Sequence, residues 1–376
     1  MGLITVMCIM PYATLMLLLV AHDRKQKKST PVPAADLKAK FSIIVPMRNE
    51  AKNLLALWDG LNQQNYPIDH FEVIFVNDQS TDDGPIILSA LLTKSQLDAQ
   101  LLHTYGTTFS PKKQALVQGI NQSRYPWIIT LDADTTMGRD WLNAYNDLIA
   151  TQSPDFIAGP VALTGGHDLL FDLQDAEFSA LQLVTHYTFQ NDPVLCNGAN
   201  LAFKSSVFEA LNGYKGNEHI ASGDDVFLLR KIALHPTYRA VFMNDDRGLV
   251  WTKGAETWRK LWFQRMRWAS KTRAIGSWRL SAIAILVLGT NVGVLALFFA
   301  AVLGLASWTI FMVTVSVKIV VDFLTWRQKQ QQRSCVAMVI NTTLGIGGII
   351  DWATELKIDK HKEDFGQTMA FWGVSS

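Results

Sequence analysis

No charged residue occurs between Ser281 and Val317. A helix that crosses a bilayer needs about 20 mainly apolar residues, so this stretch is too long for a single crossing. It predicts two helices, near residues 280–303 and 307–326, joined by a very short turn. The next loop, Arg327 to Arg333, is basic, which the positive-inside tendency assigns to the cytosol.

The N-terminal stretch from Leu3 to Ala21 is also apolar and of spanning length, with one mild break at Pro11. A signal peptide would carry positive charge before its apolar run, whereas here a basic segment, residues 24–28, follows it. This order predicts an uncleaved membrane anchor whose following chain is cytosolic. A third and weaker span candidate, Cys335 to Trp352, leaves open on which side of the membrane the C-terminal tail lies.

The composition excludes several classes of protein. Of the 376 residues, 49% are hydrophobic and only 18% are charged, whereas an ordinary soluble domain has about 25% charged residues. The 34 basic and 33 acidic residues give a net charge of +1, so we expect no nucleic-acid partner. The three cysteines lie far apart, which indicates neither a disulfide framework nor a zinc site.

Between the apolar ends, the chain alternates between two patterns. Short runs rich in β-branched residues are typical of buried strands, and they lie at 41–45, 73–76 and 127–131. Longer helical patterns separate them, near 50–64, 112–122 and 140–150. This alternation predicts an α/β domain with a Rossmann-like, mostly parallel sheet.

The predicted organisation of the whole chain follows from these segments. It comprises an N-terminal transmembrane anchor (1–22), a basic linker (23–39), a cytosolic α/β domain (40–250), an interfacial amphipathic helix (251–279), C-terminal transmembrane helices (280–352) and a tail (353–376).

Polar clusters follow three of the predicted strands. They are Pro46 to Glu50, Asn77 to Asp83, and Asp132-Ala133-Asp134. One such cluster alone is ordinary turn and capping chemistry. Because ligands of parallel α/β sheets bind at the carboxyl ends of the strands, three clusters in register predict a binding site.

The cluster Asp132-Ala133-Asp134 is the most specific of the three. Two carboxylates two residues apart at a strand end suit Mg²⁺, which prefers one or two carboxylates together with phosphate oxygens. The alternative is a capped turn that enters the next helix. Lys112 and Lys113, at the start of a predicted helix, are either phosphate ligands or a solvated surface pair.

Two motifs lie further along the chain. Asp224 and Asp225 follow Ser222-Gly223 and open a predicted helix, where acids serve either as N-terminal caps or as a general base. In the segment 264–268, Gln264, Arg267 and Trp268 share one helix face. An apolar stripe on another face, interrupted by Arg265, predicts a helix in the membrane interface.

Two charged residues fall inside the second of the two predicted C-terminal spans. Lys318 and Asp322 are four residues apart and would lie one helical turn from each other. Ionisable groups in membrane helices are candidates for function. We expect these two to pair with each other near the cytosolic end of the helix.

In order, the motifs VPMRNE, NDQSTDD, DAD, SGDD and QRMRW resemble those of the family 2 glycosyltransferases of GT-A fold, in their membrane-embedded branch. That branch includes cellulose, hyaluronan and poly-N-acetylglucosamine synthases and ceramide glucosyltransferase. The resemblance covers about residues 40–275. It departs from the family pattern at Asn77, where the family has Asp, and at Gly223-Asp224-Asp225, where the family has Thr or Ser followed by Glu-Asp.

The resemblance implies a nucleotide-sugar donor, with uridine as the usual base, and Mg²⁺ or Mn²⁺ held by Asp132 and Asp134. It implies an inverting transfer with Asp225 as general base. The other catalytic positions that it implies are Asp224, Gln264, Arg267 and Trp268, with the last two at the diphosphate and the acceptor. The donor-binding positions that it implies are Pro46, Glu50, Asp78, Lys113 and Asp132.

The acceptor stays open at this stage. A processive polysaccharide synthase would thread its product through the transmembrane helices, and three or four spans leave little room for a channel without a partner subunit or oligomer. A single-addition enzyme would glycosylate a lipid. A third alternative is a non-catalytic nucleotide-binding membrane protein. The expected location is the inner (plasma) membrane, with the α/β domain cytoplasmic.

Overall fold

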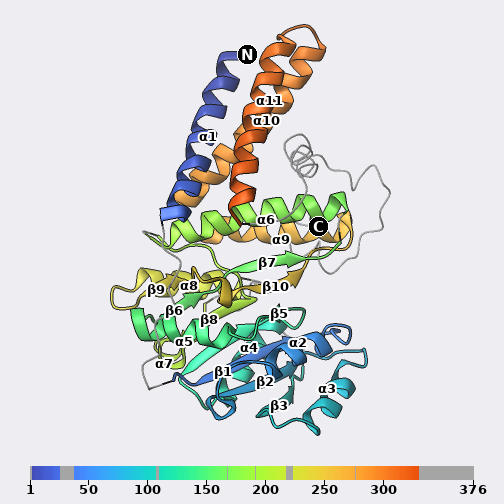
Figure 1. Cartoon of the computed structure of the whole chain (residues 1–376), viewed down its shortest axis with the longest axis vertical. Helices are drawn as coiled ribbons and strands as arrows, with labels where there is room; N and C mark the ends of the chain where they lie inside the picture. The colour runs from blue at the N-terminus through green and yellow to red at the C-terminus, as the bar shows by residue number, and fades with distance from the viewer. Residues whose placement is uncertain are drawn as a thin grey trace. The chain divides into compact units, whose positions relative to one another are not determined.

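The computed structural model describes residues 2–25, 38–106, 110–166, 168–190, 192–216, 223–275 and 277–329. The chain divides into two compact units. One, the helical unit, comprises Met1–Asp23, Gly166–Leu183 and Gly254–Ser376. The other, the α/β unit, comprises Arg24–Gly165 and Val184–Lys253. Figure 1 labels the helices and strands of both.

The α/β unit is built on a seven-stranded sheet of order β3-β2-β1-β4-β8-β6-β9. Its strands are β1 (Phe41–Met47), β2 (Phe71–Asn77), β3 (Ala99–His103), β4 (Trp127–Leu131), β6 (Phe156–Ala158), β8 (Asn200–Lys204) and β9 (Ala240–Phe242). All neighbouring strands are parallel except β8, which is antiparallel to β4 and β6. The predicted α/β fold with a mostly parallel sheet is confirmed.

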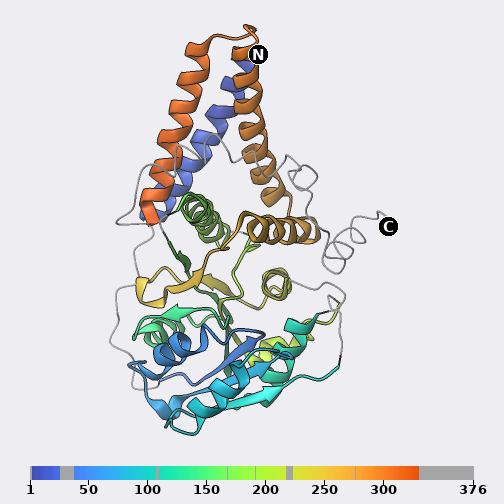
Figure 2. The ribbon, with the colours of Figure 1, turned by 90° about the vertical axis from the view of Figure 1, so that its right-hand side faces the viewer.

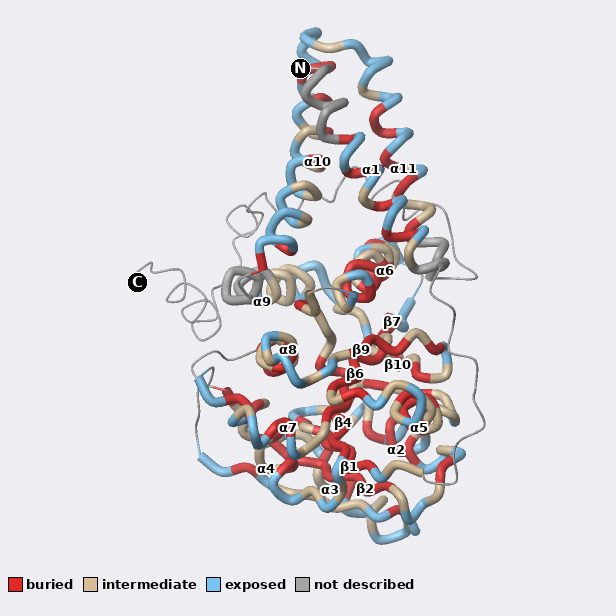
Figure 3. Tube along the Cα trace, turned by 90° about the vertical axis from the view of Figure 1, so that its left-hand side faces the viewer, coloured by how far each residue is buried: buried red, intermediate tan, exposed pale blue. Residues whose placement is uncertain are grey.

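The central strands β1, β2 and β4 are almost entirely buried (Figure 3), and Pro46 of β1 is their one partly exposed residue. Strands covered on both faces read as continuous apolar runs, which is why the sequence pattern identifies them. Phe41 pairs with Phe71 of β2 and with Trp127 of β4, so the three strands start level. Their carboxyl ends, and the polar clusters that follow, therefore share one edge of the sheet.

Helices cover both faces of this sheet. One face carries α2 (Leu54–Asn62), α3 (Gly84–Leu92) and α5 (Trp141–Gln152), and the other carries α4 (Pro111–Gln122), α7 (Ser205–Ala210) and α8 (Asp224–Leu234). Short 3-10 turns are η1 (Ile68–His70) and η2 (Asp246–Gly248). Each face is an apolar cluster of strand and helix side chains, and helices on both faces are typical of a doubly covered sheet.

A second, three-stranded sheet has the order β5-β10-β7. Its strands are β5 (Thr136–Met137), β7 (Val161–Thr164) and β10 (Val250–Lys253). The sequence analysis predicts none of these strands, because two to four residues are too few to display a period. The boundary predicted after residue 250 falls inside β10.

The helical unit contains α1 (Gly2–Lys25), α9 (Trp258–Ile275), α10 (Trp278–Val302) and α11 (Trp308–Lys329), together with most of α6 (Leu169–Thr188). Figure 2 shows α10 and α11 side by side and joined by a short turn. Two helical segments, Trp278–Val302 and Trp308–Thr325, are long and apolar enough to cross a membrane. They match the two predicted C-terminal spans.

Inside α1, the apolar segment Ile9–His22 is shorter than a full span among the described residues. The third predicted span, Cys335 to Trp352, lies outside the residues that the structure describes.

A polar triad joins two of these apolar helices. The Lys318 Nζ lies 2.6 Å from the Asp322 Oδ2, so the predicted pair is confirmed. The hydroxyl of Tyr12 on α1 donates to the Asp322 Oδ1 at 2.5 Å, and the Lys318 Nζ lies 5.1 Å from the Tyr12 ring centroid. Lys318 is only 3% exposed, so the triad is enclosed by the helices. The triad therefore ties α1 to α11.

Candidate active site

The end of β1 and the end of β2 meet at Asp78. The Asp78 backbone N–H donates to the Met47 carbonyl at 2.8 Å, and the Thr104 hydroxyl donates to the Asp78 Oδ1 at 3.2 Å. The Arg48 Nη1 lies 3.6 Å from the Asp78 Oδ2. Asp78 is 6% exposed. A buried carboxylate with these partners is fixed in orientation, as a residue that recognises a ligand must be.

The loops after β1 and β2 also hold each other. Asn49 adopts a left-handed backbone (φ 58°), which Asn tolerates better than most residues. Its side-chain oxygen accepts the Thr81 N–H at 2.8 Å, and its own N–H donates to the Ser80 hydroxyl at 3.0 Å. The Ala51 N–H donates to the Asp82 Oδ2 at 2.9 Å. The first two predicted clusters therefore form one connected rim.

Glu50 stands between this rim and the third cluster. Its Oε2 accepts from the Asn53 Nδ2 at 2.5 Å. Burial raises the pKa of Glu50, the Asn53 hydrogen bond opposes that shift, and the charges of Asp134 and Asp132 add to it. Glu50 is therefore close enough to interact electrostatically with both carboxylates of the third cluster.

Asp132 and Asp134 follow β4 directly. The Lys112 Nζ lies 2.6 Å from the Asp132 Oδ1, and the Thr252 hydroxyl donates to the Asp134 Oδ2 at 3.0 Å. Burial and the neighbouring charge of Asp132 raise the pKa of Asp134, while the Thr252 hydrogen bond acts in the opposite direction. The two carboxylates therefore sit in a site that disfavours their combined negative charge.

Asp224 and Asp225 begin α8, after Gly223 in a left-handed conformation (φ 86°). The Gly198 N–H donates to the Asp225 Oδ2 at 3.1 Å, and the Val226 N–H donates to the Asp225 Oδ1 at 2.8 Å. Both oxygens of this carboxylate therefore accept a backbone hydrogen bond, which fixes its orientation and stabilises its charged form. The N-terminal position on α8 also favours the charged form.

Lys112 links the third cluster to the acid pair. Its Nζ lies 4.0 Å from the Asp224 Oδ2 in addition to its contact with Asp132. Burial opposes the positive charge, but Asp132 and Asp224 outweigh it and hold the pKa of Lys112 above its ordinary value. Two motifs that are 90 residues apart in the sequence therefore share one cation.

The two lysines that open α4 differ in their surroundings. Lys113, which the sequence analysis assigns to the nucleotide pocket, is buried, and its Nζ lies 5.5 Å from the Phe227 ring centroid. Lys112 contacts Asp132 and Asp224. Helix periodicity does not decide which of two adjacent lysines faces a site, so this distinction required the fold.

The acid cluster suits a divalent cation that arrives with a diphosphate. Its oxygens come from Glu50, Asp132, Asp134, Asp224 and Asp225, and Lys112 contributes one compensating charge. Within the described residues, no three His, Cys, Asp or Glu side chains are placed to hold a metal ion by themselves. Two carboxylates completed by phosphate oxygens is the arrangement that Mg²⁺ and Mn²⁺ favour.

The QRMRW motif lies on α9, which belongs to the helical unit. Arg265 makes a bidentate ion pair with Glu177 of α6, with its Nε 2.9 Å from both carboxylate oxygens. The same guanidinium donates to the Gln264 Oε1 at 2.8 Å and lies 4.3 Å from the Trp268 ring centroid. Arg265 therefore holds Gln264 and Trp268 in place.

Arg265, which interrupts the apolar stripe in the sequence, has its charge paired with Glu177 of α6. Arg267 lies on an exposed part of the same helix. The signal that was missed is the spacing of Arg265 and Trp268, which are i and i+3.

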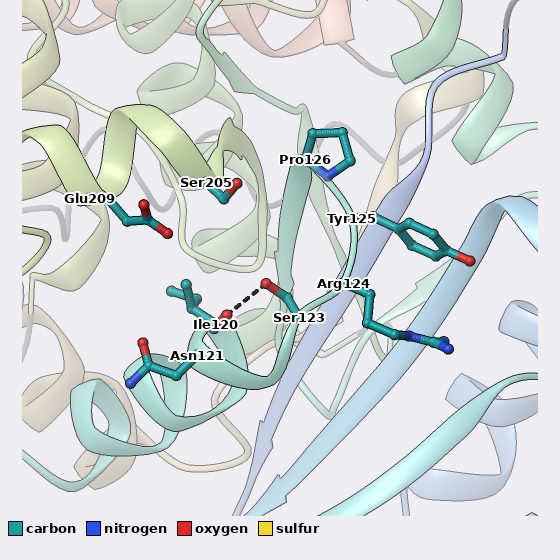
Figure 4. Close-up of a pocket in the computed structure, with 8 residues that line it drawn as sticks. All are labelled: Ile120, Asn121, Ser123, Arg124, Tyr125, Pro126, Ser205 and Glu209. Atoms are coloured by element: carbon teal, nitrogen blue, oxygen red, sulfur yellow. Dashed lines mark hydrogen bonds between the residues drawn. The ribbon is translucent and has the colours of Figure 1, made fainter.

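A separate pocket of about 470 Å³ lies at the opposite end of β4, before its first residue. Figure 4 shows the side chains that line it, which include Arg124, Ser123 and Glu209. Arg124 is committed to ion pairs with Glu72 and Asp98. None of the predicted site residues lines this pocket, so the candidate active site is the acid cluster at the other end of the strand.

Comparison with solved structures identifies the class of fold. The fold is that of a GT-A-like enzyme. It matches the structure of the mannosyltransferase PcManGT from Pyrobaculum calidifontis in complex with GDP-Man and Mn²⁺, with a TM-score of 0.60 over 91% of this chain and 98% of that one. Sequence identity is 19%, so this likeness concerns the fold alone.

The chain belongs to the family 2 glycosyltransferases. The model described as Glycosyl transferase family group 2 matches residues 127–326, more than half of the chain, and the model described as Glycosyl transferase family 2 matches residues 42–211. A third model, described as MlaA lipoprotein, matches residues 310–376 and covers too little of the chain to assign it.

Two curated relatives each align with about three fifths of the chain. The probable glycosyltransferase YdaM of Bacillus subtilis is 25% identical over 61% of this chain and 54% of its own length. The beta-monoglucosyldiacylglycerol synthase of Synechocystis is 26% identical over 63% of this chain and 49% of its own length. The chain thus spans about half the length of these relatives.

Proposed function

We propose that this protein is a membrane glycosyltransferase that transfers a sugar, with inversion, from a nucleotide sugar to an acceptor held at the membrane. The observation that carries the proposal is the convergence of Asp132, Asp134, Asp224 and Asp225 around Lys112 at the carboxyl edge of the sheet. We propose the inner (plasma) membrane as its location, with residues 40–250 as a cytoplasmic catalytic domain.

Donor binding is assigned to the rim formed by the first two clusters. Asp78 and Glu50 would contact the base or ribose, with Pro46 at the end of β1 and Lys113 on α4 lining the same pocket. The buried, hydrogen-bonded carboxylate of Asp78 supports a recognition role. The mannosyltransferase with the matching fold holds GDP-Man. A uridine nucleotide is what the family resemblance favours for this chain.

Lys112 is assigned to the diphosphate. Its ammonium is enclosed by two acids, so a phosphate that enters this site meets a charged donor already in place. A divalent cation, Mg²⁺ or Mn²⁺, would be held by Asp134 and Asp132 and would neutralise charge on the departing diphosphate. The hard oxygen donors and the raised pKa of Asp134, caused by burial and Asp132, support this assignment.

Asp225 is assigned as the general base. Two backbone N–H groups hold its carboxylate in one orientation and favour its charged form, which is the form that can take a proton from an acceptor hydroxyl. A positioned base contributes about 10²–10⁴ in rate. A single positioned base suits a one-step displacement by the acceptor hydroxyl, which would invert the anomeric centre as the nucleotide diphosphate leaves. Asp224 would hold Lys112 beside the leaving group.

Gln264, Arg267 and Trp268 are assigned to the acceptor side and the diphosphate, as the resemblance implies. The contacts of Arg265 with Gln264 and Trp268 support a fixed arrangement on α9. Arg267→Ala should lower the rate of transfer more than tenfold without unfolding the protein. A rate within a few-fold of wild type would remove Arg267 from the diphosphate.

Two acceptors are compatible with this chemistry. One relative is a beta-monoglucosyldiacylglycerol synthase, which favours a membrane lipid that receives a single sugar. The resemblance to the synthases that carry QRMRW-type motifs favours a growing polysaccharide, which a partner subunit or a second copy would help to export.

Sizing the labelled product tests the proposal. The purified protein in nanodiscs is given labelled UDP- and GDP-sugars, Mn²⁺ or Mg²⁺, and membrane lipid, and the label is partitioned between organic solvent and a sizing gel. One sugar per lipid in the organic phase identifies a lipid glycosyltransferase, and label in a polymer identifies a synthase. The Asp225→Asn variant serves as the control that binds nucleotide without transfer. If the wild-type protein behaved in the same way, it would be a non-catalytic nucleotide-binding protein.

A further inference from the structure

The strand β10 lies against the D-x-D segment, although more than 100 residues separate them in the sequence. Val250 and Trp251 pair antiparallel with Met137 and Thr136 of β5, which begins two residues after Asp134. On its other side, β10 pairs in parallel with β7. The strand is therefore fixed on both edges, and its next two residues are held in a set position.

The first of these residues contacts the D-x-D motif directly. The Thr252 hydroxyl donates to the Asp134 Oδ2 at 3.0 Å. A hydroxyl that donates to one carboxylate oxygen fixes the rotation of the group and leaves its other oxygen for a ligand. Residues in this relation to a metal-binding side chain commonly change metal affinity when they are altered.

The second residue reaches the donor rim through one intermediary. The Lys253 Nζ donates to the Asn53 Oδ1 at 2.5 Å, and the Asn53 Nδ2 donates to the Glu50 Oε2 at 2.5 Å. An amide held at both ends cannot rotate without breaking one of these hydrogen bonds. Consecutive residues of one strand thus reach two different acids of the site.

We propose that β10 is the positioning strand of the donor site, with Thr252 orienting Asp134 for the cation and Lys253, through Asn53, orienting Glu50 for the nucleotide. This inference rests on the proposed function. Thr252 and Lys253 are positioning residues, because they act through Asp134 and Glu50 and not on the substrate. The strand explains how two parts of the site that belong to different loops keep a constant separation.

Direct binding measurements test the proposal. Mn²⁺ binding to the full-length protein in nanodiscs is titrated by electron paramagnetic resonance in the presence of UDP, with a parallel series in GDP. The variant Thr252→Val removes the hydroxyl but keeps the branched shape that suits a strand. We expect it to bind Mn²⁺ about 10- to 100-fold more weakly than wild type. The conservative variant Thr252→Ser should restore binding.

A matched control lies on the neighbouring strand. Thr164 of β7 is exposed and pairs in register with Lys253, so Thr164→Val makes the same chemical change beside β10 without touching an acid. Its Mn²⁺ affinity should equal that of wild type. Lys253→Met should instead weaken UDP binding, measured without Mn²⁺, by about two- to fivefold, the size of one exposed charge contact.

The outcomes separate this inference from the proposed function. Equal Mn²⁺ affinity in wild type and Thr252→Val would overturn the role of Thr252. Equal losses of metal and nucleotide affinity in both β10 variants would mean that the strand had simply loosened, which would also overturn it. A wild-type protein that binds no Mn²⁺ with either nucleotide would remove the cation from the proposed function, and the inference would fall with it.

Discussion

Each of the two units contains, among its described residues, a cluster in which a lysine contacts aspartate, and the two clusters differ in the balance of charge. In the helical unit, Lys318 faces Asp322, and Tyr12 donates a neutral hydroxyl to the same carboxylate. In the α/β unit, Lys112 contacts two carboxylates, Asp132 and Asp224, and further acids lie nearby. The first cluster is neutral in sum, whereas the second carries excess negative charge.

This difference in charge indicates a structural role for the first cluster and a cation-binding role for the second. A buried ion pair needs matched partners, because desolvation of an uncompensated charge is costly. The triad of the helical unit meets that condition, so its two charges compensate each other without a further ligand. The acid cluster does not meet it, and burial together with neighbouring charge raises the pKa of Asp134. A site with such an imbalance gains stability when it binds a cation.

The largest effect is expected in the acid cluster. Asp225→Asn keeps the shape of the side chain but removes its basicity, so sugar transfer should fall by about 10²–10⁴. The affinity for the nucleotide, measured by calorimetry, should stay near that of wild type. Near-normal transfer by this variant would show that another group takes the proton of the acceptor.

The next largest effect is expected in the triad. Asp322→Leu leaves the charge of Lys318 enclosed and unpaired, which should lower the free energy of unfolding by about 3–5 kcal/mol. Unfolding of the protein in detergent, followed by circular dichroism, measures this loss. The double variant Lys318→Met with Asp322→Leu should recover most of the stability, whereas Tyr12→Phe should cost only about 1 kcal/mol.

If the single and double variants at Lys318 and Asp322 were equally stable, the triad would not be a balanced pair, and the contrast with the acid cluster would fail. Loss of transfer at unchanged stability in the single variant would instead give the triad a role in the reaction.

A third prediction concerns the lysine of the acid cluster. Lys112→Met removes a charge-assisted hydrogen bond to the diphosphate, worth about 1.5–3 kcal/mol, so the affinity for UDP should fall roughly 10- to 100-fold. The melting temperature should change much less than in Asp322→Leu, because both Lys112 and its partner Asp132 are partly exposed to water. Equal melting losses for the two variants would erase the distinction between the clusters.

The smallest effect is a dependence on pH. Burial raises the pKa of both Glu50 and Asp134, so the folded protein keeps protons there that the unfolded chain has already released. Stability without a cation should therefore fall as pH rises from the ordinary carboxyl range near about 4 through the raised pKa values.

Thermal melting across this pH range, with and without Mn²⁺, checks the prediction. The cation should abolish the fall in stability, and Asp134→Ala should flatten the curve in its absence. The same curve for wild type and Asp134→Ala would contradict the assigned origin of the pH dependence.

Much of this protein follows from the sequence by itself. The runs of β1, β2 and β4 were predictable, because strands covered on both faces leave a continuous apolar pattern. The helices α10 and α11 were predictable from the length and the apolar composition of their segments. The candidate acids were also predictable, because polar residues that directly follow parallel strands converge at one edge of a sheet.

Only the tertiary structure decided the partners of those residues. It placed Lys112 between Asp132 and Asp224, paired Arg265 with Glu177, and brought β10 beside the D-x-D segment. Local patterns report which face of an element is buried, and they carry no information on which distant side chain will stand opposite. Contacts between residues more than 80 positions apart depend on the path of the intervening chain, and only the tertiary structure determines that path.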